Sequence, residues 1–196
     1  MTETIVVVGP AATGKSTLGT VVAARLGKPF VDIDEIAWPY YAETGWDLER
    51  LHDRIRAVGR VAAEREWEPA RAYAVEHVLA DHAGTLIALG AGHTSYTDPS
   101  CTQRVHAALS QVPSVVLLLP SPDPQRSVAV LRERSITSKG TDWIRDGHDF
   151  LAEWVAEPLN HAVATSVVFT DGLTPEQTAE RIIAEVPESS RTESGT

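Results

Sequence analysis

Gly9-Pro10-Ala11-Ala12-Thr13-Gly14-Lys15-Ser16-Thr17 matches G-x-x-x-x-G-K-[ST], the pattern of a phosphate-binding P-loop, and decides the fold. The apolar run Ile5–Val8 precedes it and predicts a buried strand, while residues 16–26 (STLGTVVAARL) have helical spacing. A chance match in an unrelated α/β domain is the alternative, but it leaves the strand and the helix on either side unexplained. The chain is expected to bind a nucleoside triphosphate.

Each position of this loop has a chemical reason. Gly9 and Gly14 allow the backbone to turn its N–H groups towards phosphate oxygens, and Lys15 brings a positive charge to the β- and γ-phosphates. The Ser16 hydroxyl is a suitable oxygen ligand for Mg²⁺. The remaining residues expected to line the nucleotide site are Ala11, Ala12, Thr13 and Thr17.

Length and composition are those of a globular protein. The chain has 196 residues, of which 43% are hydrophobic and 22% charged, and its net charge of −10 argues against nucleic acid or an anionic membrane as a partner. The lone Cys101, the lack of a secretory signal and the lack of 18 consecutive apolar residues predict a cytoplasmic protein. We expect one domain over residues 1–186 and a disordered tail over 187–196; the oligomeric state stays open.

The apolar runs alternate with helical patterns along the chain. This alternation predicts an α/β fold, a three-layer α/β/α sandwich with a parallel sheet of about five strands. Beyond the first strand, the expected strands are residues 29–32, 85–89, 114–119 and 166–169. The expected helices after the first are residues 48–58, 68–82, 101–110, 124–134, 149–164 and 174–185.

Two segments do not fit this regular alternation. Residues 35–68 contain three of the five tryptophans and are expected to form an insertion over the sheet edge that binds an acceptor. Residues 132–147 (RERSITSKGTDWIRDG) are polar, basic and interrupted by glycine, which is typical of a mobile lid.

Two acids, Asp32 and Asp34, alternate at the end of the second expected strand. A strand period of two places both carboxylates on one side, at the edge of the sheet where ligands bind. One acid is then expected to hold Mg²⁺ through water, and the other to reach an acceptor hydroxyl. The alternative is that they are caps and turn formers.

Several motifs together resemble the shikimate kinase family and its small P-loop kinase relatives. They are the P-loop, residues 26–34 (LGKPFVDID), 89–92 (LGAG), 158–160 (PLN) and 170–175 (TDGLTP). The resemblance extends to about Val186 and implies phosphoryl transfer from ATP with Mg²⁺. It implies that Lys15 contacts the transferred phosphate, that Ser16 and Asp32 organise Mg²⁺, and that Asp34 orients or deprotonates the acceptor hydroxyl. It also implies nucleotide contacts for Asp171.

The same resemblance locates an acceptor site and shows where this chain departs from the family. Gly90-Ala91-Gly92 stands where the family has three glycines, and His93 follows it. The arginine that binds the carboxylate of shikimate is replaced by Glu68, and a second one falls near Ala156. Carboxylates bind best to arginine forks, so shikimate is an unfavourable acceptor. We expect a cationic or neutral hydroxylated small molecule, held by Asp34, Trp38, Glu64, Trp67, Glu68, Gly90, Ala91, Gly92 and His93.

The lid carries several cations that match the family's catalytic arginine only loosely. Arg132, Arg134, Lys139 and Arg145 are all candidates; Arg134 is preferred, and Arg132 is expected beside the adenine. The chain is therefore expected to be a small-molecule kinase. One alternative is a shikimate kinase whose carboxylate site uses other arginines, such as Arg65 or Arg71. A second is a nucleotide-binding regulatory module without turnover.

Overall fold

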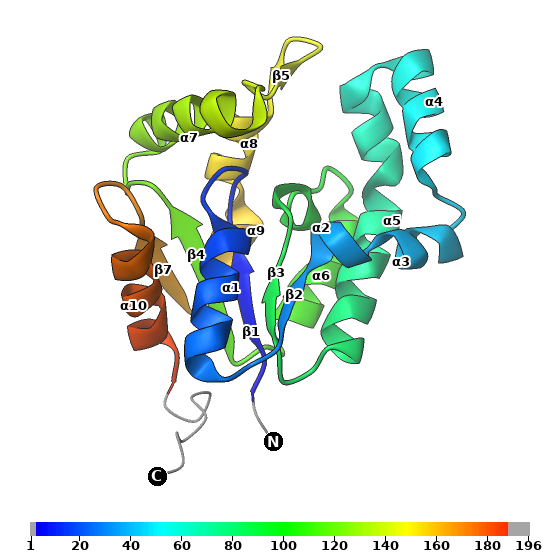
Figure 1. Ribbon diagram of the computed structural model, residues 1–196. Helices are drawn as coiled ribbons and strands as arrows, with labels where there is room; N and C mark the ends of the chain where they lie inside the picture. Colours follow the sequence, from blue (N-terminus) through cyan, green and yellow to red (C-terminus); the bar gives the residue numbers. More distant parts are fainter. Residues whose placement is uncertain (1–2, 188–196) are drawn as a thin grey trace.

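Five parallel strands form the centre of the computed structural model, which describes residues 3–187. The strands stand in the order β2-β3-β1-β4-β7 (Figure 1). The predicted fold class is confirmed. Each strand coincides with a predicted apolar run to within one residue at either end. Their bounds are β1 (Ile5–Val8), β2 (Phe30–Asp32), β3 (Leu86–Ala88), β4 (Ser114–Leu119) and β7 (Ser166–Phe169).

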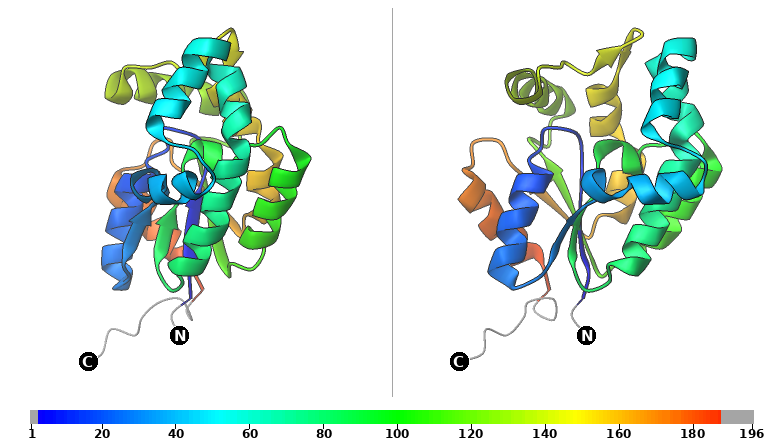
Figure 2. Two further views of the ribbon diagram at one scale, coloured as in Figure 1. Left: turned by 90° about the vertical axis from the view of Figure 1, so that its right-hand side faces the viewer. Right: turned by 45° about the vertical axis from the view of Figure 1, so that its right-hand side comes forward.

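Helices cover both faces of the sheet because both faces are apolar. On β1, Ile5 and Val7 pack into one buried cluster while Val6 and Val8 pack into another, as strand alternation requires. The right-hand view of Figure 2 shows the two helical layers on either side of the sheet. The first layer holds α1 (Lys15–Leu26) and α10 (Pro175–Glu185); the second holds α5 (Arg60–Asp81), α6 (Pro99–Leu109) and α9 (Pro158–Val163).

The segment after β2 is helical and rises beyond the carboxyl ends of the strands. It forms an arm, here called the acceptor arm, of three short helices and the first half of α5 (Figures 1 and 2). The helix α5 begins at Arg60, eight residues before the predicted start at Glu68, and runs through Pro69. Pro69 removes one helical hydrogen bond, but buried Ala63 and Ala70 anchor the helix on both sides of it. The short helices are α2 (Ile33–Ile36), α3 (Trp38–Glu43) and α4 (Leu48–Val58).

A second projection, the lid, lies opposite the acceptor arm. The prediction of an irregular lid over residues 132–147 is half wrong, because α7 (Pro124–Lys139) stays helical to its end at the left-handed Gly140. A short hairpin of β5 (Ile144–Arg145) and β6 (His148–Asp149) follows. The helix predicted over 149–164 is two helices, α8 (Phe150–Ala156) and α9, because Pro158 begins a new one.

Two sequence predictions concern the ends and the environment of the chain. Most of the predicted tail, residues 188–196, lies outside the described residues. Among residues 3–187, no helix has both the length and the apolar character needed to cross a bilayer. The cytoplasmic location itself stays a prediction.

Candidate active site

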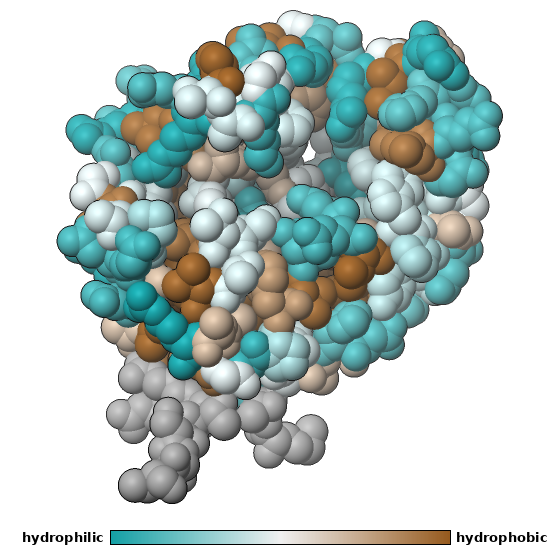
Figure 3. All heavy atoms as spheres, viewed as in Figure 1, coloured by the Kyte–Doolittle hydropathy of each residue, from teal (hydrophilic) through white to brown (hydrophobic). Residues whose placement is uncertain are grey.

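A cavity of about 750 Å³ opens at the carboxyl ends of the strands, between the P-loop, the acceptor arm and the lid. The space-filling view shows the surface hollowed between the two projections (Figure 3). Many predicted site residues line this cavity, and they come from segments far apart in the sequence. They are Ala11, Ala12, Gly14, Lys15, Ser16, Thr17, Asp34, Trp38, Glu64, Trp67, Ala91, Gly92 and His93.

The P-loop has a backbone conformation that its glycines make possible. Gly9 has a φ of +136°, and a Cβ there would lie 2.4 Å from the carbonyl oxygen of Leu118. Gly14 caps α1 with a φ of +91°, and Ala12 also has a positive φ of 64°. These turns leave the N–H groups at the start of α1 without helical partners, so they are suited to phosphate oxygens. Gly9 and Thr13 do not line the cavity, and Thr13 Oγ1 donates to the Pro10 carbonyl at 3.0 Å.

Lys15 is the buried cation of the nucleotide side. Its Nζ donates to the carbonyl oxygens of Gly9 and Pro10, both at 2.7 Å, so its charge is held over the loop. Burial lowers the pKa of Lys15 to about 8, against the opposing effect of the Asp34 charge. A phosphate oxygen that approached Lys15 would favour its charged form.

Asp32 and Asp34 lie on different elements, Asp32 at the end of β2 and Asp34 in α2. The strand β2 ends at Asp32, whose Oδ1 accepts a hydrogen bond from the Asp34 backbone N–H at 3.0 Å and caps α2. Asp34 belongs to the first turn of that helix, lines the cavity and has a side chain that is 67% exposed. The expectation that strand period placed both carboxylates together was wrong; a strand-to-helix turn separates them.

The donors near Lys15 fit a magnesium ion. Ser16 lines the cavity. Asp32 is buried and does not line it, but its negative charge raises the pKa of Lys15 and so acts close to the nucleotide side. Mg²⁺ needs few protein oxygens because it keeps waters and binds substrate phosphates. Among residues 3–187, no group of three or more His, Cys, Asp or Glu side chains is arranged to hold a metal ion by itself.

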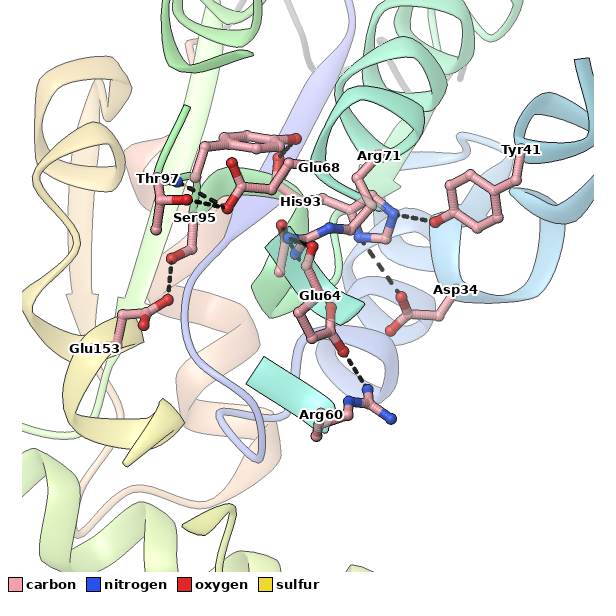
Figure 4. A network of polar contacts seen from close by, with 12 residues as sticks. Asp34, Tyr41, Arg60, Glu64, Glu68, Arg71, His93, Ser95, Thr97 and Glu153 are labelled. Carbon is pink, nitrogen blue, oxygen red and sulfur yellow. Dashed lines mark hydrogen bonds and ion pairs between the residues drawn. The ribbon is translucent and has the colours of Figure 1, made fainter. Parts of the chain in front are cut away.

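On the acceptor side, His93 lies between Asp34 and Tyr41 (Figure 4). His93 lies in the 3-10 helix η1 (Ala91–Thr94) and is only 4% exposed. Its Nε2 is 2.6 Å from the Tyr41 hydroxyl, and its Nδ1 is 3.7 Å from Asp34 Oδ1. Burial lowers the pKa of His93, so the imidazole is neutral at pH 7.

Arg71 brings a guanidinium to the acceptor side, but its charge is already engaged. Its Nη1 donates to the Gly92 carbonyl at 2.5 Å, and its Nη2 donates to the Glu64 carbonyl at 3.1 Å. The Glu64 carboxylate lies 3.8 Å from Arg71 Nη1 and also forms an ion pair with Arg60 (Figure 4). Arg60, Glu64 and Arg71 all line the cavity. Arg65, the other arginine considered for a carboxylate, does not.

Glu68 does not line this cavity, and its expected place in the acceptor pocket is wrong. Its carboxylate is 3% exposed and accepts hydrogen bonds from Thr97 N, Thr97 Oγ1 and Asp98 N at 2.8–2.9 Å. Figure 4 shows this second cluster away from Asp34 and Tyr41. Glu68 lies one turn after Glu64 on α5, and the donors of the loop before α6, at Thr97 and Asp98, hold its carboxylate away from the cavity. Glu68 therefore stabilises the fold and does not reverse the charge of the acceptor site.

The motif Gly90-Ala91-Gly92 has glycine where neighbouring side chains approach it. A Cβ at Gly90 would lie 2.2 Å from Asp34 Oδ1 and 2.6 Å from His93 Nδ1. A Cβ at Gly92 would lie 2.3 Å from Arg71 Nη1. Ala91 and Gly92 line the cavity, whereas Gly90 lies behind its wall. Only the middle position therefore tolerates the alanine found here.

An aromatic wall completes the acceptor side. Trp38 and Trp67 stack with their ring centroids 6.0 Å apart, and Tyr41 packs edge-on against Trp67 at 4.8 Å. All three line the cavity, whereas Tyr40, also considered for stacking, donates to Asp81 and lies outside it. The wall offers a flat apolar face to a ring.

The lid places different cations at the cavity from those expected. Arg132 pairs with Asp149 at 2.5 Å, and Arg134 donates to Thr170 Oγ1 at 3.1 Å, so neither lines the cavity. Lys139 and Arg145 do line it, and the charge of Lys139 acts on Lys15. The helical continuation of α7 carries Lys139 there. The position of Arg134 therefore does not support its predicted catalytic role. Lys139 is better placed to reach the transferred phosphoryl group.

Two further placements concern the edges of the cavity. Asp171 forms a 2.5 Å ion pair with Arg126, which lowers its pKa, and does not line the cavity. Asp146, at the tip of the lid hairpin, accepts a hydrogen bond from the Val61 N–H at 3.0 Å. This carboxylate caps α5, whose N-cap Gly59 has no side chain of its own, and joins the lid to the acceptor arm.

Sequence reasoning missed several residues of the cavity. Tyr41 and Arg60 had no motif, and the lid residues around the hairpin were too irregular to place. A helical pattern starting at Arg60 would have put Arg60, Glu64 and Arg71 on one face, with spacings of four and seven residues. The missed lining residues are Tyr41, Arg60, Ser138, Thr141, Trp143, Phe150 and Trp154.

Comparisons with known proteins agree with this architecture. A family model described as shikimate kinase matches residues 11–187. A shikimate kinase from Saccharopolyspora erythraea is 30% identical over 194 residues, covering 95% of each chain. The structure of a shikimate kinase from Acinetobacter baumannii in complex with shikimate superposes with a TM-score of 0.64 at 20% identity, covering 93% of this chain and 92% of that one. A gluconokinase from Sinorhizobium meliloti 1021 superposes with a TM-score of 0.58 at 18% identity, covering 93% and 90%.

Proposed function

The chain belongs to the shikimate kinase family, whose members phosphorylate a hydroxyl group with ATP and Mg²⁺, and we propose that its own acceptor is a neutral or cationic hydroxylated small molecule other than shikimate. The resemblance inferred from its motifs is thereby confirmed, as is the assignment to ATP-dependent kinases. The identity of the acceptor is the part that rests on the geometry of this chain.

One observation carries the proposal: Arg71, the more buried of the two α5 arginines that line the cavity, is engaged by protein groups before any substrate binds. Arg71 lies 3.8 Å from the Glu64 carboxylate and donates to two backbone carbonyls. Glu64 also pairs with Arg60. An incoming carboxylate would have to displace Glu64 from two partners and would meet the negative charge of Asp34, so little of the usual arginine–carboxylate stabilisation is left.

The remaining groups of the acceptor side suit an uncharged ring with hydroxyls. The stacked Trp38 and Trp67 give it an apolar face, and the exposed Asp34 carboxylate offers a hydrogen-bonding group. A cationic group is compatible too, because the Asp34 carboxylate is exposed on the acceptor side and tryptophan faces attract cations.

The residues then divide the reaction between them. The P-loop amides and Lys15 hold the phosphates and stabilise charge on the transferred group, and Ser16 and Asp32 would hold Mg²⁺, which neutralises phosphate charge when bound. The acceptor oxygen bonds to the γ-phosphorus as the bond to the bridging oxygen of ADP breaks. Asp34 takes the hydroxyl proton. The lid and the aromatic wall limit access of water to this step.

A second candidate, a shikimate kinase with a redrawn site, is favoured by a specific observation. Arg71 and Arg60 do line the cavity, so their guanidinium groups would be near a carboxylate if Glu64 turned away. The family match and the relative from Saccharopolyspora erythraea support this candidate as well.

An unbiased screen separates the candidates. The protein is incubated with MgATP and pools of hydroxylated metabolites that include shikimate, amino sugars, cyclitols and nucleosides, and products are searched for the mass gain of one phosphoryl group. Lys15→Ala is the control for contaminating kinases. We expect a neutral or cationic product. Shikimate as the best acceptor would overturn the proposal, and tight ATP binding with no product would favour a nucleotide-binding module.

A further inference from the structure

His93 contains a buried polar atom that lacks a hydrogen-bond partner among the described residues. The atom is Nδ1, which has less than 1 Å² of exposed surface and lies 3.7 Å from Asp34 Oδ1. Buried polar groups are almost always paired, so an exception that lines a candidate site needs an explanation. The opposite ring atom is fully engaged with Tyr41. His93 is therefore held on one side and faces the acceptor acid on the other.

The Tyr41 hydroxyl fixes which nitrogen carries the proton. Burial raises the pKa of Tyr41 well above its usual value, so the phenol stays protonated. Its hydroxyl lies 2.6 Å from His93 Nε2 and is suited to donate to it. A neutral imidazole that accepts at Nε2 carries its proton on Nδ1. The Asp34 carboxylate lies 3.7 Å from that nitrogen, and the Gly90 backbone lies beside it.

We propose that His93 is a positioning residue that uses Nδ1–H to hold the Asp34 carboxylate in the orientation needed at the acceptor hydroxyl, with Tyr41 fixing its tautomer. The inference rests on the proposed function, because it takes Asp34 as the acid beside the acceptor. It extends that function by assigning a role to the histidine that follows the glycine turn.

The packing around Gly90 supports this pairing. Asp34 Oδ1 and His93 Nδ1 both lie close to the position that a Gly90 Cβ would occupy, at 2.2 Å and 2.6 Å. Any side chain there would push the two groups apart. The charged groups facing His93 are Asp34, Arg71 and Glu64. The two acids raise its pKa and the arginine lowers it, so their effects partly cancel. The neutral imidazole thus remains the form that meets Asp34.

The reacting atoms are those of the kinase reaction already described, and His93 neither gains nor loses a proton overall. The hydroxyl proton goes to the Asp34 oxygen that does not accept from His93. The Nδ1–H bond stabilises the carboxylate in one rotamer, which matters because the Asp34 side chain is 67% exposed and otherwise free to turn.

Nitrogen NMR of the whole protein tests the tautomer without any acceptor. A long-range ¹H–¹⁵N spectrum of uniformly ¹⁵N-labelled protein at pH 7 is recorded, and His93 is assigned by the signal that disappears in His93→Asn. We expect a neutral ring with the proton on Nδ1, and a shift towards mixed tautomers in Tyr41→Phe. A proton on Nε2, or a doubly protonated ring, would overturn the proposal whether or not the protein turns over substrate.

A matched pair of variants tests the consequence for catalysis. Asparagine places an amide N–H near the position of Nδ1, whereas leucine of similar size has no donor. With MgATP and either shikimate or its uncharged amide as the probe, His93→Leu is expected to lower kcat about tenfold, the scale of one hydrogen bond to a charged group, with the ATP KM unchanged. His93→Asn should stay within about threefold. Equal losses in both variants that follow their melting temperatures would show a merely structural role and overturn the inference.

If the unmodified protein turns over neither probe, the acceptor found in the screen replaces them for the same pair of variants, and the NMR result decides the role of His93 in either case.

Discussion

The two sides of the cavity are built from different kinds of groups. The nucleotide side is mostly backbone from one continuous segment, residues 9–17, with Lys15 as its buried charge. The acceptor side is made of side chains from separate elements, with Asp34, Tyr41, Arg71 and His93 coming from α2, α3, α5 and η1. Backbone cradles bind any triphosphate, whereas side chains determine which second molecule fits. Variation in acceptor specificity is therefore expected on the second side alone.

The largest effect is expected on the nucleotide side. Lys15→Ala should lower kcat by about 10²–10³-fold, because it removes a preorganised charge at the transferred phosphoryl group. The fold should remain, since among residues 3–187 the Lys15 side chain donates hydrogen bonds to the carbonyls of Gly9 and Pro10 alone. Steady-state kinetics and circular dichroism check both parts. A folded variant with near-normal activity would contradict the role assigned to the P-loop.

Asp34→Asn is expected to act on the other side only. It should lower kcat by about a hundredfold, the lower range for a general base, and leave the Kd of MgATP unchanged. Asp32→Asn is the matched control on the nucleotide side, and it should instead raise the Mg²⁺ concentration needed for half-maximal rate. Exchanged effects would mean that the two acids have been assigned to the wrong sides.

Two cations of the lid, Lys139 and Arg134, are expected to show a smaller effect that again depends on whether the residue lines the cavity. Lys139 lines the cavity near Lys15, whereas Arg134 bonds to Thr170 outside it. Lys139→Ala should lower kcat about tenfold by removing one charge at the phosphates. Arg134→Ala should change kcat less than threefold, as expected of a residue away from the reacting groups. A reversed order of the two losses would return the catalytic role to Arg134.

The pH dependence of nucleotide binding gives the smallest effect. Because burial lowers the pKa of Lys15 to about 8, the lysine of the free protein loses its charge as the pH rises through that value. Phosphate binds the charged form, so affinity falls on the alkaline side. The protonated fraction drops from about nine-tenths at pH 7.0 to about a quarter at pH 8.5, and the association constant for MgATP should drop about fourfold. Calorimetric titration of Lys15→Met, expected to be flat over this range, is the control.

The contrast between the sides also explains what could be predicted from the sequence. The P-loop is formed by residues that are neighbours in the sequence, so its pattern predicted the strand, the turn and the helix together. The strand bounds followed from apolar runs such as Ser114–Leu119. The acceptor site depends on helical phase over long separations. Glu68 was placed in the pocket by a motif alignment, but α5 turns it towards Thr97 and presents Glu64 and Arg71 to the cavity instead.

Other misses have equally local causes. The Asp32 side chain caps α2, so the chain changes from strand to helix before it reaches Asp34. An alternating pattern of apolar residues does not predict such a change. The helix α7 continued to Lys139 because its polar residues still have adequate helix propensity, although they resembled a loop. Tyr41 was found only through its contact with His93, 52 positions away in the sequence.

The central claim is that the acceptor side no longer selects a carboxylate, because Glu64 already occupies Arg71. The most direct measurement is the ratio of kcat/KM for shikimate to that for its uncharged amide, which differs only at that group. The account predicts a ratio near or below one in the unmodified protein, and a rise in the ratio in Glu64→Gln, where Arg71 is released. A ratio above about a hundred in the unmodified protein, the scale of an intact arginine–carboxylate pair, would contradict it.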